Sequence, residues 1–277
     1  MPVIAMTQEM GSLAKEVALE LAQSMKLAVM RHEVVEHVAE KMHVHTSLVN
    51  RLREGKAGLI ERVTTNKENL ALYSAEEVFE LANKGNVVIR GWGATCLLRP
   101  VPHVLCVRIT RSVGKRVEWL MNQLETDDRE FAESEIHRSD AAHASRMHRQ
   151  FGVTWGDPTL YDMVLNTDRL SVQSCVEQIK LLGSRPEFQQ SASSSALLAN
   201  MTLDMHIRAA FKSHPETQHV NITFECAKGD VTLKGIVANA DEQAAAQKVV
   251  AGVNGVSSVK SMLRVISDTK HFPAARR

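Results

Sequence analysis

Short apolar runs alternate with amphipathic stretches over the first two thirds of the chain. The runs "PVIAM", "LAVM", "NVVIRG" and "HVLCVRIT" have the length of buried strands, and the segments between them show helical periodicity. Helices are expected from about Ser12 to Met25 and from about Glu33 to Lys41. The first has one apolar stripe at four-residue spacing, formed by Leu13, Val17, Leu21 and Met25. The alternation predicts βαβ units around a mainly parallel sheet, because parallel strands need a crossover that is usually helical.

The segment between Val113 and Gln150 is long, strongly charged and helical in character. It fits a solvated pair of helices, and in a phosphoryl-transfer fold it fits a mobile lid whose arginines close over phosphates. After it, "YDMVLNT" predicts a last strand, and a helix is expected from about Ser171 to Leu182. We therefore expect an α/β first domain over residues 1–182.

A change of composition follows this domain. The stretch "GSRPEFQQSASSSA", which begins at Gly183, interrupts the hydrophobic periodicity and predicts a linker over residues 183–198. Residues 199–267 then predict a helix, a hairpin with its turn at Lys228-Gly229-Asp230, a second helix and a last strand. This pattern indicates a small α+β domain of the order αββαβ, followed by a tail over residues 268–277.

Composition and charge narrow the class of protein. The 277 residues are 44% hydrophobic and 23% charged, with a net charge of +1, which is typical of a globular protein and gives no support to nucleic-acid binding. No apolar run approaches the ~18 residues of a membrane span, and the first residues lack the pattern of a secretory signal, so we expect a cytoplasmic protein without a transmembrane segment. The four cysteines are scattered and predict free thiols. The twelve histidines lack ligand spacing, and no metal site is expected.

The first expected helix follows the segment "EMGS", which has a glycine and a small hydroxyl residue after a buried strand. Free N–H groups at the start of a helix bind anions, and Gly11 and Ser12 let the backbone approach closely. A Walker A loop has the order G-x-x-x-x-G-K-[ST], whereas Lys15 here is followed by Glu16, whose carboxylate would repel a polyphosphate. The spacing leaves two interpretations open: a phosphate-binding loop and an ordinary strand-to-helix turn.

Residues 3 to about 182 resemble the cytidylate-kinase-like family, a branch of the P-loop nucleoside-monophosphate kinases. The segment "GSLAKEVA" is similar to the family's "GSGGREIA", and "VVIRGWGA" is similar to "VIVGRGA". The stretch "SDAAHASRMHRQFGVTWGDPTLYDMVLNT" is similar to a family stretch with an Asp and an Arg on a helix, an FG-x-x-W turn, DP-x-x-YD and a final NT. The resemblance implies a P-loop kinase-like parallel sheet flanked by helices, with a helical lid.

The chain departs from the family at charged positions. When the segments are aligned on Gly11, the lysine of an active kinase falls at Ala14, and Lys15 takes the position of the magnesium-linked hydroxyl group. Trp92 stands where an arginine is expected between two glycines, and His143 stands where a lid arginine is expected. Phosphoryl transfer depends on cations around the moving group, and the loss of one such contact costs on the order of 10²- to 10³-fold in rate. The resemblance therefore implies a degenerate P-loop.

The same resemblance implies which residues form the site. Lys15 and Arg146 are the catalytic candidates, since they could substitute for the missing cations from displaced positions. The candidates for nucleotide or phosphate binding are the loop and the cations expected around it: Gly11, Ser12, Leu13, Ala14, Lys15, Arg90, Arg116, Arg138 and His143. For an active enzyme, Mg²⁺ and ATP are the implied cofactors.

The C-terminal region resembles the BON domain, with "GDVTLKGIV" matching its G-x-V-x-L-x-G-x-V hairpin and "VNGVSSV" matching a later motif. BON domains are generally binding modules, which implies a small-molecule, phospholipid or protein ligand. Between Ala199 and Ile266 there are seven basic and six acidic residues, too balanced for anchoring to anionic lipid by charge alone.

Three functions follow as hypotheses. The leading one is a nucleotide or phosphate sensor, a weak or inactive kinase coupled to a BON binding module. The alternative is an active CMP or dCMP kinase that uses ATP, with Lys15 and lid arginines in adjusted roles. The third is a non-catalytic scaffold for a protein partner.

Overall fold

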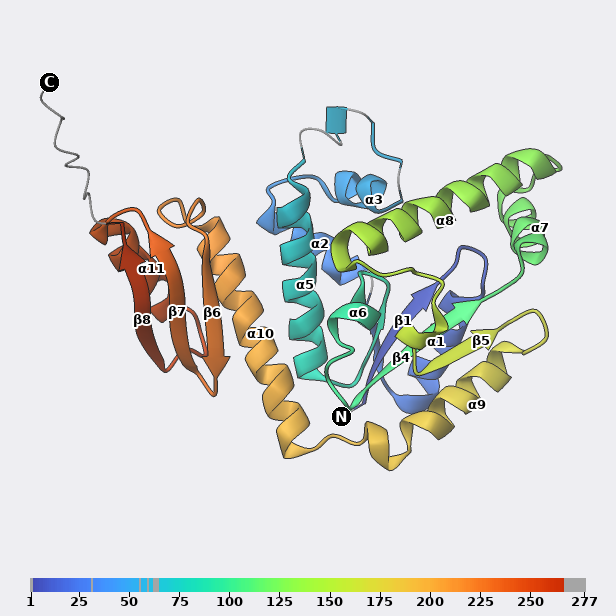
Figure 1. Cartoon of the computed structure of the whole chain (residues 1–277). Coiled ribbons are helices and arrows are strands. Elements are labelled where there is room, and N and C mark those ends of the chain that lie inside the picture. Colours follow the sequence, from blue (N-terminus) through green and yellow to red (C-terminus); the bar gives the residue numbers. More distant parts are fainter. Residues whose placement is uncertain (1, 31, 55, 59, 62–64, 267–277) are drawn as a thin grey trace, which may run out of the picture. The chain divides into compact units, whose positions relative to one another are not determined.

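The computed structural model of the chain describes residues 2–30, 32–54, 56–58, 60–61 and 65–266 (Figure 1). Contacts within the chain divide it into two compact units, Met1–Leu198 and Ala199–Arg277, which we describe separately. No helix of the described residues is long and apolar enough to cross a membrane. All four cysteines are free thiols, as predicted, and burial raises the pKa of Cys106 to about 12.

The first unit is built on a five-stranded sheet with the order β2-β3-β1-β4-β5, and every neighbouring pair is parallel. The central strand β1 is buried along almost its whole length, which explains why its sequence is a continuous apolar run rather than an alternating one. The predicted parallel sheet is confirmed. The strands are β1 (Val3–Gln8), β2 (Ala28–Met30), β3 (Val87–Arg90), β4 (Val104–Thr110) and β5 (Met163–Asn166).

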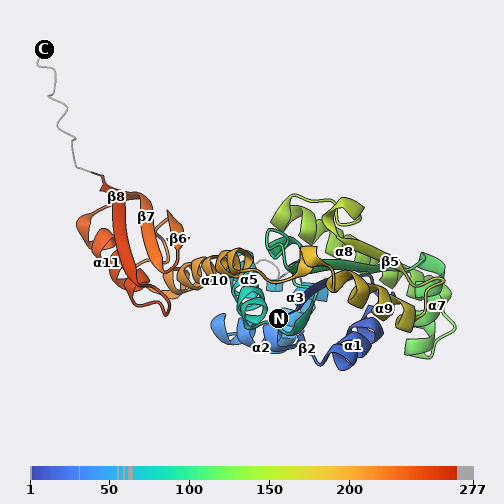
Figure 2. The ribbon, with the colours of Figure 1, turned by 90° about the horizontal axis from the view of Figure 1, so that it is seen from below.

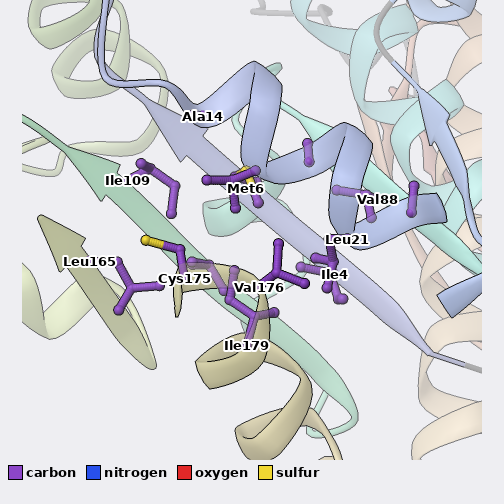
Figure 3. Packing of buried hydrophobic residues seen from close by; sticks show 14 of the residues in the cluster. Ile4, Met6, Ala14, Leu21, Val88, Ile109, Leu165, Cys175, Val176 and Ile179 are labelled. Carbon is purple, nitrogen blue, oxygen red and sulfur yellow. The ribbon is translucent and has the colours of Figure 1, made fainter. Parts of the chain in front are cut away.

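Helices α1 (Ala14–Met25) and α9 (Val172–Gly183) lie side by side on one face of this sheet (Figure 2). Val17, Leu21 and Met25 of the predicted stripe pack there, whereas Leu13 precedes α1 and is not part of this core. Figure 3 shows Leu21 of α1 beside Ile4 of β1, with Ile179 of α9 in the same cluster. Neighbouring strand residues project to the opposite face. On that face Cys106 contacts the backbone oxygen of Thr95 in α6, at 3.5 Å.

The remaining helices of this unit connect and cover the strands. Helix α5 contacts β3, α6 contacts β1, and α2 packs on α3 and α5. Ser171 begins α9 by accepting a hydrogen bond from the N–H of Ser174. The bounds of these helices are α2 (His32–Lys41), α3 (Thr46–Glu54), α5 (Lys67–Lys84) and α6 (Ala94–Leu97).

The charged segment after β4 forms two helices, α7 (Val113–Leu124) and α8 (Arg129–Phe151), which pack against each other. Apolar residues of both helices form a small core that Met10, in the loop after β1, also contacts. This pair of helices therefore lies against the loop between β1 and α1. A 3-10 turn, η1 (Pro158–Leu160), leads from α8 to β5.

A further 3-10 turn, η2 (Pro186–Phe188), and the first part of α10 (Ala192–Ser213) occupy residues 186–198. The second unit contains the rest of α10, then β6 (Ile222–Ala227), β7 (Asp230–Val237), α11 (Ala240–Ala251) and β8 (Ser258–Val265). The predicted αββαβ order is confirmed. Strand β7 pairs antiparallel with β6 and parallel with β8, and the helices bury one face of this sheet. Positive φ angles at Lys228 and Gly229 form the tight hairpin turn that the sequence predicts.

Candidate functional site

The loop between β1 and α1 contains two residues with a left-handed backbone. Gly11 has a φ of 78° and Leu13 a φ of 60°, both in the left-handed region, and Leu13 stands directly before the first residue of α1. A left-handed leucine is uncommon, since its Cβ crowds the backbone there. No side chain among the described residues caps α1, so its first N–H groups remain for another acceptor.

Gly11 is also required by the close approach of α7. A Cβ atom at this position would lie 3.2 Å from Cα of Arg116 and 3.1 Å from the indole of Trp119. Because one of these neighbours is backbone, it cannot move aside without shifting α7. The loop and α7 therefore form one packed unit, which no spacing argument could reveal.

Glu9, the first residue of the loop, binds the end of the neighbouring strand β4. Its Oε1 accepts a hydrogen bond of 2.6 Å from Nη2 of Arg108, and its Oε2 accepts one of 2.7 Å from Oγ1 of Thr110. The backbone N–H of Arg111 also donates to Oε2, at 3.1 Å. The side chains of Arg108 and Glu9 are 7% and 11% exposed, so this ion pair is shielded from solvent. Such charge-assisted bonds fix the loop against β4.

Arg116 of α7 links this pair to the helix α8. Its Nη1 and Nη2 donate to the two carboxylate oxygens of Asp140, at 3.0 and 2.7 Å, and its Nε lies 3.7 Å from Oε2 of Glu9. Burial opposes the charge of Arg116, but the hydrogen bonds to Asp140 and the charge of Glu9 outweigh it and raise the pKa of Arg116. Two carboxylates thus balance the charges of Arg108 and Arg116.

Trp155, after α8, holds Arg108 from the other side. The guanidinium carbon of Arg108 lies 4.4 Å from the centre of the Trp155 ring, and its Nη1 donates to the Trp155 backbone oxygen at 2.9 Å. His143 of α8 stacks on the same indole, with ring centroids 5.1 Å apart. The residue that stands at the expected lid-arginine position therefore packs on an aromatic ring.

The structure brings only some of the predicted site residues together. Gly11, Ser12, Leu13 and Ala14 form the turn itself, and Arg116 lies beside it. Lys15 lies in the first turn of α1 with its side chain exposed to solvent.

The other predicted cations make contacts within the protein. Arg90, at the end of β3, donates to Oε1 of Gln8 at 2.9 and 3.2 Å. Arg138 forms an ion pair of 2.6 Å with Glu135 on its own helix. Arg146 reaches from α8 to the backbone oxygen of Leu52 in α3, at 3.5 Å, and burial together with the positive charge of Arg149 lowers the pKa of Arg146.

Glu9 and Asp140 are the important residues that the sequence does not single out as part of the site. Glu9 stands directly after β1, at the edge where the carboxyl ends of parallel strands meet, and this position is the signal that could have found it. Asp140 lies on the helix whose motif resembles the family, where the sequence suggests an acidic residue without indicating its partner.

Where the resemblance places a magnesium-linked hydroxyl group, the chain has Lys15, whose ammonium group donates hydrogen bonds and does not bind a cation. Within the described ranges, no group of three or more His, Cys, Asp or Glu residues could hold a metal ion.

The family model described as the cytidylate kinase-like family matches residues 3–169. The chain belongs to the cytidylate kinase-like family. A BON domain model matches residues 202–267, so the second unit is a BON domain. P-loop kinases of this kind generally use ATP and Mg²⁺. No curated protein matches the chain.

Solved structures share the fold of the first unit. An uncharacterized protein from Eubacterium ventriosum is 19% identical with a TM-score of 0.53, covering 67% of this chain and 100% of that chain. Two kinases are more distant. A shikimate kinase from Bacteroides thetaiotaomicron is 17% identical with a TM-score of 0.43, covering 65% of this chain and 97% of that chain. A gluconokinase from Sinorhizobium meliloti is 12% identical with a TM-score of 0.44, covering 69% of this chain and 98% of that chain.

Proposed function

We propose that the cytidylate kinase-like domain binds a nucleotide or another phosphate ligand at the β1–α1 loop without efficient catalysis. The observation that carries this proposal is the pairing of Arg108 and Arg116 with carboxylates, while Lys15 extends into solvent. The loop keeps left-handed residues and an uncapped helix start, which favour an anion. Phosphoryl transfer depends on cations around the moving group, and two of the cations beside the loop, Arg108 and Arg116, are already paired with Glu9 and Asp140.

In this proposal the protein is a sensor, a weak or inactive kinase whose degenerate loop retains binding. The BON domain is the second binding module, with a small molecule, a phospholipid or a protein as its ligand. ATP and Mg²⁺ are cofactors only if turnover exists. The cytoplasmic location stays a prediction.

Calorimetry tests the proposal directly. Purified full-length protein is titrated with MgATP, CMP and dCMP, and ADP formation is followed in the same samples. We expect binding of at least one ligand with turnover far below that of an active kinase. Efficient turnover that Lys15→Ala abolishes would establish the active CMP or dCMP kinase instead. The absence of both binding and turnover would favour the protein-interaction scaffold.

Three variants test whether the backbone of the loop, rather than the charge of Lys15, binds the ligand. Lys15→Ala removes a charge beside the loop, and Lys67→Ala removes the same charge from the exposed start of α5. Because Lys15 is solvated, we expect each variant to change ligand affinity by less than about threefold. Gly11→Ala, which disturbs the loop itself, is expected to abolish binding.

A further inference from the structure

The largely buried carboxylate of Glu9 binds two of the positive groups beside the loop. A third, Arg111, donates from Nη1 to the backbone oxygen of Gly11 at 3.4 Å. Arg108 donates to the Glu9 carboxylate from β4, and Arg116 approaches it from α7. Thr110 and the N–H of Arg111 complete its surroundings, so both carboxylate oxygens accept hydrogen bonds. An anion is thus already present beside the loop, and the protein itself provides it.

A guanidinium group binds carboxylates and phosphates through the same charge-assisted hydrogen bonds. A phosphate that enters the loop would therefore compete with Glu9 for the guanidinium groups of Arg108 and Arg116. Three buried polar atoms beside the loop have no hydrogen-bond partner among the described residues. They are Ser12 Oγ, in a residue 1% exposed, Arg116 Nε, in a residue 3% exposed, and Arg111 Nε. Buried polar groups are rarely left so.

We propose that Glu9 is a resident anion of the loop, which holds Arg108 and Arg116 in place when the loop is empty and competes with a ligand phosphate for them. This inference rests on the proposed function and concerns the regulation of the same site. The affinity for phosphate is then limited by the cost of displacing Glu9 or of placing two anions side by side. Neutralising Glu9 removes that cost and strengthens binding.

Glu9→Gln tests this competition with inorganic tripolyphosphate as the probe, titrated into the full chain by calorimetry. We expect the variant to bind at least about tenfold more tightly than the wild type, because a like charge close to the bound anion is removed. The matched control is Glu118→Gln, which removes the same charge from an exposed position on α7. The control should stay within about twofold of the wild type.

A second variant covers the case in which Glu9→Gln does not fold. Thr110→Val removes the hydroxyl group that donates to Glu9 at 2.7 Å and leaves every charge unchanged. It loosens the hold on the carboxylate, and we expect tripolyphosphate to bind about threefold more tightly. Circular dichroism establishes whether each variant is folded before titration.

The outcomes separate this inference from the proposed function. Tighter binding by Glu9→Gln supports the inference; if Glu9→Gln does not fold, Thr110→Val decides in its place. If the variant binds and the wild type does not, the inference is supported and only the proposed function is contradicted. If the wild type binds tripolyphosphate and the deciding variant binds it equally well or more weakly, the inference is overturned. Glu9 would then position the arginines for phosphate. An equal gain in Glu118→Gln also overturns the inference. If neither the wild type nor the deciding variant binds, both ideas fail.

Discussion

The indole N–H of Trp155 donates a hydrogen bond of 3.2 Å to Oγ1 of Thr7, across 148 positions of sequence. Both residues are buried, at 6% and 7% exposure. The bond ties the segment after α8 to the central strand β1. It also orients the Trp155 ring, which Arg108 and His143 both contact.

Trp155 is therefore expected to be a structural residue of the site. Trp155→Ala removes a large buried ring and should lower the free energy of unfolding by about 3–5 kcal/mol. Trp155→Phe keeps most of the ring but leaves Thr7 Oγ1 without its donor, and should cost about 1 kcal/mol. Urea denaturation measures both values, with Trp92 and Trp119 as the remaining fluorophores of the first unit.

A double-mutant cycle with Thr7→Val isolates the hydrogen bond. If the bond contributes as the geometry indicates, Thr7→Val and Trp155→Phe should couple by about 1 kcal/mol. Strict additivity of the two single variants would count against it.

Gly11→Ala should be among the most damaging small substitutions in the first unit. It places a Cβ at 3.2 Å from the Arg116 backbone and forces alanine into a φ of 78°. We expect a loss of at least about 2 kcal/mol in unfolding free energy, from strain and overpacking together. Thermal or urea denaturation gives the value.

Gly114→Ala provides the control on the adjoining helix. No atom lies within 4 Å of the Cβ that it introduces, and Gly114 is in α7. Gly114 is the second residue of α7 and does not have a positive φ, so alanine fits there and restricts the unfolded chain. This variant should be unchanged or more stable by up to about 1 kcal/mol. Equal losses in the two variants would mean that the approach of α7 to the loop is not what requires Gly11.

The fold follows from local patterns that the sequence displays openly. Buried parallel strands give continuous apolar runs, and α1 shows its stripe every four residues, so the elements could be predicted. The pairing of Glu9 with Arg108 could not be predicted in the same way, because it joins residues 99 positions apart. Arg116 was predicted as a phosphate ligand, and its ion pair with Asp140 depends on how α7 packs against α8. The sequence shows that residue 116 is a cation, but tertiary structure decides whether it pairs with a phosphate or with Asp140.

A separate group of charges joins α2 to α5. Both ring nitrogens of His37 contact carboxylates on α5, Nε2 at 3.3 Å from Glu76 and Nδ1 at 3.1 Å from Glu77. Lys41 lies 3.5 Å from Glu76, and Tyr73, Glu80 and Lys84 are the other titratable groups nearby. The hydrogen bond to Glu76 and the charges of both carboxylates outweigh burial and the repulsion from Lys41, and they raise the pKa of His37 above 6.5.

This arrangement predicts a pH-dependent stability. A histidine whose pKa is raised in the folded state stabilises fully below its unfolded pKa of 6.5, and that contribution is lost as the pH rises through the higher folded value. Burial raises the pKa of Glu77 too, and the charge of His37 partly opposes that rise, so the two groups are coupled. The difference between the wild type and His37→Gln therefore reports the imidazole together with its effect on Glu77. Urea denaturation between pH 5.5 and about 8.5 should show the wild-type advantage at low pH shrinking as the pH rises.

His137→Gln is the matched control for this pH series. His137 is 61% exposed on α8 and lies 3.8 Å from Glu133, so its ion pair is solvated and should contribute little. Its stability should run parallel to that of the wild type over the whole pH range. If His37→Gln also ran parallel to the wild type, the pKa of His37 would be the same in the folded and unfolded states, and its contacts with Glu76 and Glu77 would add no pH-dependent stability.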